Sequence, residues 1–222
     1  MANKKNNQAE NHTVDMLDDS LVKLTDNMKK NQKRILIICV VIALLIAGVM
    51  IYTFSARKSN NQAHVAIGNA DRELLFENND SAALEIYSQV AVKSGDAANR
   101  AKLEAAIILY NKGNYQEALD MVKGYKAKEA IIGAAAYSLK GDCMVQLDDF
   151  NGAVDAFKAA IKQSDNNPYY TPFFMVKLAR VYGALNNYAE QANVYQEIVD
   201  KYPNYDANVN KELELAKIRA GK

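Results

Sequence analysis

The feature of this sequence that most restricts its fold is a type of segment that recurs four times after residue 60. The segments read SAALEIY, QEALDMV, NGAVDAF and AEQANVY, and each directly follows one of four register marks, Asp80, Tyr115, Phe150 and Tyr188. Successive marks are separated by 35, 35 and 38 residues. A nearly constant period in this range is typical of a solenoid, in which each repeat is one supersecondary unit stacked on its neighbours. The sequence therefore predicts a stack of similar units.

The composition indicates that these units are helical. Half of the residues are apolar, Gly and Pro together number only 13, and Trp is absent. This is not the turn-rich composition of an all-β protein. After residue 60 there are 18 Lys and Arg against 21 Asp and Glu. A nucleic-acid binder needs a clustered basic face, so we expect no nucleic-acid partner.

Within each unit, small and large residues alternate at fixed places. In one repeat they are Tyr137, Gly141, Met144, Leu147, Ala153, Phe157 and Ala160, and in the last they are Leu178, Ala179, Tyr182, Leu185, Tyr188, Tyr195, Ile198 and Pro203. This pattern resembles the tetratricopeptide repeat over roughly residues 61–204. Two departures are Gln191, at a position where the family has Ala, and Asp71, where the family has a small residue.

The resemblance implies an all-α solenoid of about four helical hairpins. Antiparallel helices approach closely only where the crossing residues are small, so we expect Gly141 to face Ala153, and Ala179 to face Ala192. Phe157, Tyr182 and Tyr195 should then be core aromatics and not a ligand cage. Residues 205–222 should form a capping helix that covers the last apolar edge with Leu213, Leu215 and Ala216.

An uncharged apolar run occupies residues 35–54, with the sequence ILIICVVIALLIAGVMIYTF. Twenty helical residues match a hydrocarbon core about 30 Å thick. Thirteen of them are Ile, Leu, Val or Phe, and no polar stripe interrupts them, so a buried soluble helix is the weaker interpretation. A cleaved signal peptide has a shorter apolar region and a brief basic start, whereas 34 residues precede this run. We expect a single transmembrane signal anchor in contact with the bilayer.

The flanks of the run suggest its orientation. The preceding twenty residues carry five basic residues, Lys23, Lys29, Lys30, Lys33 and Arg34, against three, Arg57, Lys58 and Arg72, in the following twenty. The excess favours a cytoplasmic tail, residues 1–34, and an exported repeat domain after a linker at 55–60. The tail should be disordered over residues 1–12 and carry a short amphipathic helix over 14–28. That helix is either a surface helix or a contact strip for a cytoplasmic partner or a second copy of the chain.

No motif for catalysis, cofactor or metal binding is present. The histidines are His12 and His64, and no Walker, G-x-S-x-G or G-x-G-x-x-G pattern occurs. Acidic pairs such as Asp148 with Asp149 fall at a predicted turn. Cys39 and Cys143 are too far apart in the expected fold to form a disulfide, and each should be a lone buried thiol. We expect a protein that is not an enzyme and holds no cofactor or metal.

The expected functional surface is the groove lined by the first helix of each hairpin, which in the tetratricopeptide family holds peptides or helices. The corresponding positions here carry mixed charges, which argues against a basic clamp for a C-terminal carboxylate. These positions are Arg100, Tyr110, Asp142, Gln146, Lys177 and Arg180.

The order of segments, and the stretch KGDCMVQLDDFNGAVDAFKAAIKQ, resemble a bacterial inner-membrane family that includes the ancillary subunit of the Sec translocon. The resemblance implies an inner-membrane, single-pass adaptor with periplasmic repeats, whose partners are translocon subunits, periplasmic chaperones or emerging chains. One alternative is a structural scaffold for another envelope complex, in cell division or outer-membrane coordination. Another is an organelle-surface receptor with cytosolic repeats.

Overall fold

The computed structural model describes the backbone of residues 3–93 and 95–221 and the side chains of residues 32–34, 36–93 and 95–221. Over these residues the chain is helical, with turns and short connections and no strand. It divides into two units, residues 1–58 and 59–222. The helices are α1 (Asn3–Leu75), α2 (Asp80–Ala91), α3 (Asp96–Asn111), α4 (Tyr115–Lys123), α5 (Ala130–Gln146), α6 (Phe150–Gln163), α7 (Tyr170–Ala184), α8 (Tyr188–Lys201) and α9 (Asn208–Arg219).

Helix α1 contains the apolar run and continues on both sides of it. From Gln32 on it is long and apolar enough to cross a membrane, by length and composition alone, and the side chains described in the run are exposed. Cys39 is therefore exposed rather than buried, since the side chains described around it in the run are all exposed, and Cys143 is the buried free thiol.

Two segments expected to be irregular are helical in the structure. Residues 55–60, expected to be a linker, belong to α1 because SARKSN contains neither Pro nor Gly to end a helix. The segment 1–12, expected to be disordered, also belongs to α1 from Asn3 on. The side chains of the amphipathic strip at 14–28 lie outside the described residues, so its contact role stays a prediction.

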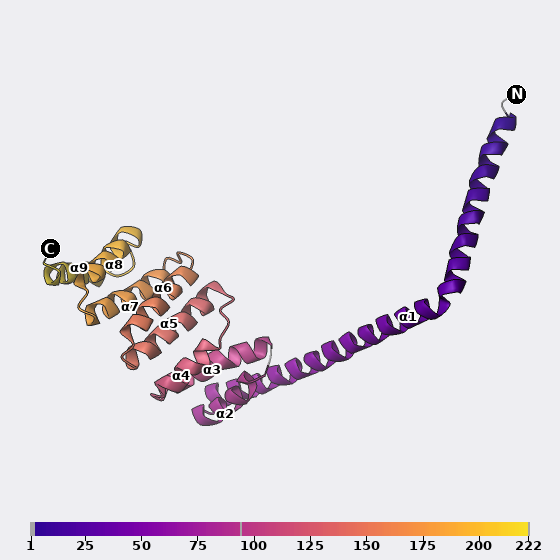
Figure 1. The fold of residues 1–222 in the computed structure, drawn as a ribbon. Coiled ribbons are helices and arrows are strands. Elements are labelled where there is room, and N and C mark those ends of the chain that lie inside the picture. Colours follow the sequence, from indigo (N-terminus) through magenta and orange to yellow (C-terminus); the bar gives the residue numbers. More distant parts are fainter. Residues whose placement is uncertain (1–2, 94, 222) are drawn as a thin grey trace. The chain divides into compact units, whose positions relative to one another are not determined.

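The second unit is a stack of helical hairpins, drawn from purple to yellow along the sequence (Figure 1). The last turns of α1 pair with α2, because Ala63, Ile67 and Ala70 share one apolar cluster with Tyr87 and Val90. The pairs α3 with α4, α5 with α6 and α7 with α8 follow, and each helix from α2 on contacts the next. The all-α solenoid predicted from the sequence is confirmed.

The turn inside each hairpin has the same backbone geometry in all four pairs. Asn78, Gly113, Asp148 and Asn186 have positive φ angles of 50°, 82°, 59° and 56°, and they repeat the intervals of the sequence register. Gly, Asn and Asp are the residues that tolerate this left-handed conformation best. In three of the turns the next residue caps the second helix through its side chain, as Asp149 does by accepting a hydrogen bond from the Gly152 amide at 2.9 Å.

The small residue Gly141 allows close packing between α5 and α6, but against a different neighbour from the one expected. An added Cβ at Gly141 would lie 2.8 Å from the ring of Phe157. The glycine therefore makes room for the aromatic ring of the second helix, while Ala153 is buried in the same core. Phe157, Tyr182 and Tyr195 are all buried, so the prediction that they are core aromatics is confirmed.

The wider last interval of the sequence register arises in α6 and not in the connection before α7. That connection, 164–169, is as long as 124–129 before α5, while α6 has 14 residues and α4 has 9. The last helix, α9, begins at Asn208 and packs on α8. Leu213 and Ala216 are buried in that contact, whereas Leu215 is exposed on the opposite face.

Candidate protein-binding surface

The six residues expected to line the groove lie on three first helices of the stack. Arg100 and Tyr110 are on α3, Asp142 and Gln146 on α5, and Lys177 and Arg180 on α7. These helices contact one another, α3 with α5 and α5 with α7, so their residues form one continuous row. We call this surface the first-helix row.

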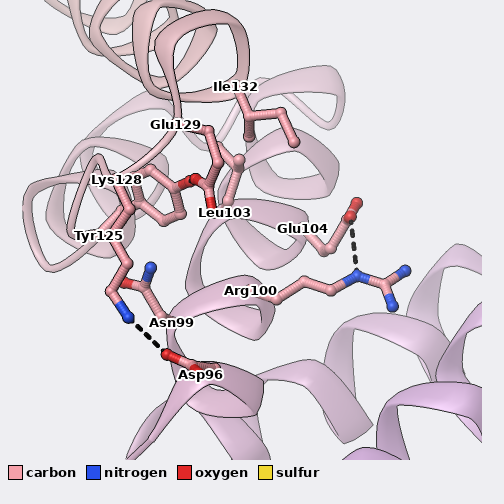
Figure 2. Close-up of a pocket in the computed structure, with 9 residues that line it drawn as sticks. All are labelled: Asp96, Asn99, Arg100, Leu103, Glu104, Tyr125, Lys128, Glu129 and Ile132. Atoms are coloured by element: carbon pink, nitrogen blue, oxygen red, sulfur yellow. Dashed lines mark hydrogen bonds and ion pairs between the residues drawn. The ribbon is translucent and has the colours of Figure 1, made fainter.

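A depression of about 370 Å³ lies at the α3 end of the row (Figure 2). Its apolar lining consists of Leu103 from α3, Tyr125 from the α4–α5 connection and Ile132 from α5, which is 52% exposed. Charged side chains surround these groups, among them Arg100 and Glu104. An apolar lining inside a polar rim suits an apolar side chain presented by a protein partner.

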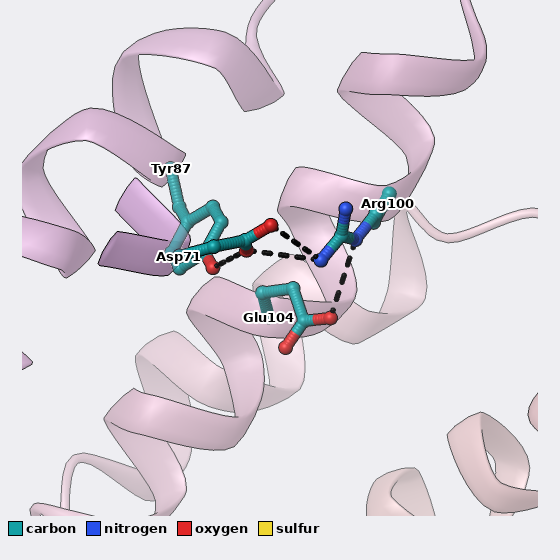
Figure 3. A network of polar contacts seen from close by, with 4 residues as sticks. All are labelled: Asp71, Tyr87, Arg100 and Glu104. Atoms are coloured by element: carbon teal, nitrogen blue, oxygen red, sulfur yellow. Dashed lines mark hydrogen bonds and ion pairs between the residues drawn. The ribbon is translucent and has the colours of Figure 1, made fainter. Parts of the chain in front are cut away.

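The Arg100 side chain belongs to a polar network that joins three helices (Figure 3). One guanidinium nitrogen donates to both carboxylate oxygens of Asp71, each at 2.9 Å, and Nε lies 3.5 Å from Glu104. Asp71 also accepts a hydrogen bond from the Tyr87 hydroxyl at 2.5 Å. Arg100 is therefore largely committed to contacts within the stack.

Burial and the Asp71 carboxylate together raise the pKa of Tyr87 far above its ordinary value. Only 1% of Tyr87 is exposed, and ionising it would put a second negative charge beside Asp71. The hydroxyl therefore stays protonated and donating over the physiological range.

Asp142 and Lys177 form a second bridge, between α5 and α7. Lys177 Nζ lies 2.5 Å from Asp142 Oδ2, and both side chains are about three-quarters buried. The same nitrogen lies 5.1 Å from the centre of the Phe173 ring and 5.8 Å from that of Phe157. Burial raises the pKa of Asp142 even though the Lys177 hydrogen bond and charge lower it. The pair neutralises the charge of both groups at the middle of the row.

Tyr110 connects α3 to the same region. Burial raises its pKa, the negative charge of Asp142 raises it further, and a hydrogen bond with Gln146 lowers it. Its ring also lies against Tyr115, with ring centres 5.3 Å apart. The structure thus brings Tyr110, Asp142, Gln146 and Lys177 together.

Arg180 completes the row beside two further depressions. One, of about 200 Å³, also contains Asp142, Lys177 and Phe157, and the other, of about 410 Å³, contains Tyr195 and residues of α9. Burial raises the pKa of Tyr195, the negative charge of Glu212 raises it further, and the charge and hydrogen bond of Arg180 lower it. Arg180 itself is exposed. It is the cationic member of the row with no carboxylate within ion-pair distance among the described residues.

The described side chains offer little for covalent or metal chemistry. No group of three or more His, Cys, Asp and Glu that could hold a metal ion occurs among them. Burial raises the pKa of the Cys143 thiol to about 11. A thiol with such a pKa is protonated at neutral pH and is a poor nucleophile.

Sequence reasoning missed the partners of Arg100 and the exposed apolar groups of the row. Asp71 could have indicated a partner for Arg100, because a carboxylate at a position that favours a small, buried residue needs a compensating cation. Nothing in the sequence indicated that Ile132 and Phe173, which is 43% exposed, would be accessible. An apolar residue on an amphipathic helix is normally assigned to the core. Only the packing of the helices shows that they remain accessible.

Replacing Tyr87 by Phe should lower the free energy of unfolding by about 1.5 kcal/mol at neutral pH, because a hydrogen bond to a charged acceptor is lost. The folded pKa of Tyr87 lies above the unfolded value of about 10. The contribution of the hydroxyl is therefore complete below pH 10 and is lost as the pH rises beyond it. Denaturant unfolding of the wild type and of Tyr87→Phe in mild detergent, from neutral to alkaline pH, should show the difference in their free energies of unfolding shrinking as the pH rises. Tyr169→Phe, at an exposed residue, is the control, and a difference between wild type and Tyr87→Phe that is constant with pH would contradict the assignment.

Comparisons with known proteins agree with this architecture. The sequence matches the family described as tetratricopeptide repeat-like domain over residues 69–183, more than half of the chain, and a tetratricopeptide repeat family over residues 174–205. No curated protein matches the sequence.

Solved structures show the same fold at low sequence identity. A crystal structure of MamA is 19% identical with a TM-score of 0.57, and the match covers 68% of this chain and 84% of that one. A second MamA structure is 18% identical with a TM-score of 0.60, covering 73% and 84%. Kinesin light chain repeats of Podosopora anserina are 16% identical with a TM-score of 0.57, covering 72% and 87%. At such identities these structures are similar in fold alone, and it is the family match that shows that this chain belongs to the tetratricopeptide repeat-like family.

Proposed function

We propose that the chain is a membrane-anchored adaptor that binds a protein partner along the first-helix row and has no catalytic activity of its own. Tetratricopeptide repeats are protein-interaction scaffolds, and the apolar run of α1 has the length and composition of a membrane anchor. The observation that carries the proposal is the combination of exposed apolar groups with charges that neutralise one another. Ile132 and Phe173 are accessible, whereas Arg100 and Lys177 are paired with carboxylates of the stack.

This combination specifies the chemistry of the partner. A partner recognised by charge would need unpaired charged side chains on the row. Arg100 is already paired with Asp71, and Lys177 with Asp142. What remains is apolar area with a polar rim, which fits an amphipathic helix or an apolar stretch of an extended chain. The row is therefore suited to segments that are themselves unfolded or only partly folded.

Periplasmic repeats beside the protein-export machinery of a bacterial inner membrane are the setting we propose for this adaptor. The excess of basic residues before the apolar run supports an N-terminus in the cytoplasm. In that setting translocon subunits, periplasmic chaperones and emerging chains are the partners. A reporter fused after Lys222 and active on one side of the membrane only tests the orientation, and activity on the cytoplasmic side would overturn it.

A capture experiment tests the row. The double variant Ile132→Ser, Phe173→Ser should lose most of its partner capture, because both changes remove exposed apolar contacts without opening a cavity in the core. Lys177 is unsuited to such a test, since its loss would leave the largely buried carboxylate of Asp142 without a partner. The measurement is a mild-detergent pull-down of the intact protein, scored for translocon subunits against division or cell-wall proteins.

The matched control is Ile218→Ser, which removes an apolar side chain that is 70% exposed, lies on α9 and lines none of the depressions described along the row. Capture by this variant should equal that of the wild type. Equal capture by the double variant would remove the row from consideration. Capture of division or cell-wall proteins in place of translocon subunits would support the scaffold alternative.

A further inference from the structure

One edge of the repeat unit lies where the chain enters it from the apolar run. Asn60 is the first residue of this unit that is partly buried, and the α2–α3 connection lies against it, because a Cβ added at Gly95 would be 2.7 Å from Asn60 Oδ1. The α4–α5 connection reaches the same edge. Asn99, in the first turn of α3, accepts a hydrogen bond from the Lys126 amide at 2.7 Å and donates one to the Lys126 carbonyl at 3.0 Å.

Most of the exposed side chains of these two connections are basic or apolar, and Glu129 is the acidic one. Val92 is 84% exposed, and Lys93, Lys126 and Lys128 are exposed with it. Lys128 forms an ion pair with Asp96 at 2.6 Å, but Lys93 and Lys126 have no ion-pair partner in the part of the chain that the structure describes. We call Val92, Lys93, Lys126 and Lys128 the lysine edge.

The charge balance around the lysine edge is positive. The acidic residues of the two connections and the adjoining helix end are Asp96, which Lys128 neutralises, and Glu129, which accepts a hydrogen bond from the Tyr125 hydroxyl at 3.3 Å. Arg57 and Lys58 directly precede this unit in the sequence, and no acidic residue occurs from residue 35 to residue 70. The basic character of the segment after the apolar run thus continues on the folded surface.

Chain connectivity limits how far this edge can be from a bilayer that the apolar run crosses. Asn60 is the sixth residue after Phe54, the last residue of the run. Even a fully extended chain of that length spans at most about 20 Å, and a helical one about 9 Å. The headgroup layer itself extends about 5 to 8 Å beyond the hydrocarbon core. The lysine edge is therefore tethered within reach of the lipid headgroups.

We propose that the lysine edge rests on the anionic headgroups of the membrane in which α1 is anchored. This inference depends on the membrane anchoring given under the proposed function. Lys93 and Lys126 pair with lipid phosphates, and Val92 enters the interfacial region, where an apolar side chain is more stable than in water. This contact would fix which side of the stack faces the membrane, and with it the distance of the first-helix row from the membrane surface.

The opposite ends of the hairpins have a different composition. Their turns contain Glu77, Asp148 and Asp149 and a single lysine, Lys112. Phe76, in the α1–α2 turn, is 77% exposed and lies at the far end of the same α1 segment. It is as apolar and accessible as Val92 but is surrounded by acidic and amide side chains, so it serves as the matched control position.

The test uses the full chain with Cys39→Ser, carrying an environment-sensitive fluorophore at Val92→Cys or at Phe76→Cys. Cys143 is buried and should not be labelled. Each protein is reconstituted into nanodiscs of phosphatidylcholine, with or without phosphatidylglycerol, containing a lipid with a nitroxide on its headgroup. We expect strong quenching of the label at 92 in discs with phosphatidylglycerol, and no quenching of the label at 76. Lys93→Glu with Lys126→Glu, or added salt, should abolish most of the quenching at 92.

Each other outcome overturns a defined part of the inference. Equal quenching at 92 and 76, or no quenching at 92, refutes the contact between the lysine edge and the headgroups. Alkaline carbonate extraction of the chain reconstituted into vesicles tests the anchor separately, and a chain that stays in the vesicles leaves the anchor standing. Extraction of the chain by carbonate refutes the anchor and the edge together. Quenching at 92 that is unchanged by phosphatidylglycerol and by the lysine reversals refutes the role of anionic lipid.

Discussion

Replacing Phe157 by Ala is expected to lower the free energy of unfolding by about 3 to 5 kcal/mol, the range typical of a large-to-small change in a packed core. Phe157 is 1% exposed and belongs to the apolar cluster that joins α6 to α7 and α8. Its ring also fills the space left by the missing side chain of Gly141 and lies under the Lys177 ammonium. Removing the ring therefore leaves a cavity and takes an apolar support from the Asp142–Lys177 pair.

Denaturant unfolding of the full chain in mild detergent, followed by circular dichroism, measures this loss. The control is Phe76→Ala, in which the same ring is removed from an exposed turn. A change at such a site normally stays within about 0.5 kcal/mol. If the two variants unfold at the same denaturant concentration, Phe157 does not occupy the core position assigned to it.

Gly141→Leu is expected to destabilise the protein by roughly 1 to 3 kcal/mol or more through overpacking. An added Cβ would already lie 2.8 Å from the Phe157 ring, closer than non-bonded carbons approach. Neither side can yield easily, because Gly141 lies on the buried face of α5 and the ring is held by its own cluster. The helices α5 and α6 would have to move apart.

The control for this change is Gly68→Leu, at a helical glycine of α1 where an added Cβ meets nothing within 4 Å. There, leucine should be neutral or slightly stabilising, because leucine favours a helix more than glycine does. A double variant, Gly141→Leu with Phe157→Ala, should lose less stability than the sum of the single changes. Removing the Phe157 ring removes the clash with the leucine, and the leucine fills part of the cavity that the ring leaves. Strict additivity would contradict the direct contact between the two residues.

The repeat fold was predictable because its determinants are local and periodic. The intervals between Asp80, Tyr115, Phe150 and Tyr188 correspond to the starts of α2, α4, α6 and α8. The turn residues Asn78, Gly113, Asp148 and Asn186 have the left-handed geometry that their residue types favour. Each hairpin depends on about 35 residues of sequence, so a pattern read along the chain identifies it.

The groove was predictable in part, for the same reason. Positions on the first helices follow from the register, so the six expected residues do lie on α3, α5 and α7. Whether a charged side chain there is available to a partner depends on a residue from another repeat. Asp71 pairs with Arg100, and Asp142 pairs with Lys177. Such pairs are about 30 residues or more apart in the chain, and nothing in the local pattern specifies them.

The sequence alone was sufficient for the helical class, the number and register of the hairpins, the core aromatics and the apolar run, because each follows from residue type at a fixed spacing. The tertiary structure alone decided that Gly141 faces Phe157, that Arg100 and Lys177 are paired with carboxylates of the stack, and that Ile132, Phe173 and Val92 stay accessible. These properties depend on which helices approach each other and at what distance, which is a result of packing the whole stack and not of any one segment.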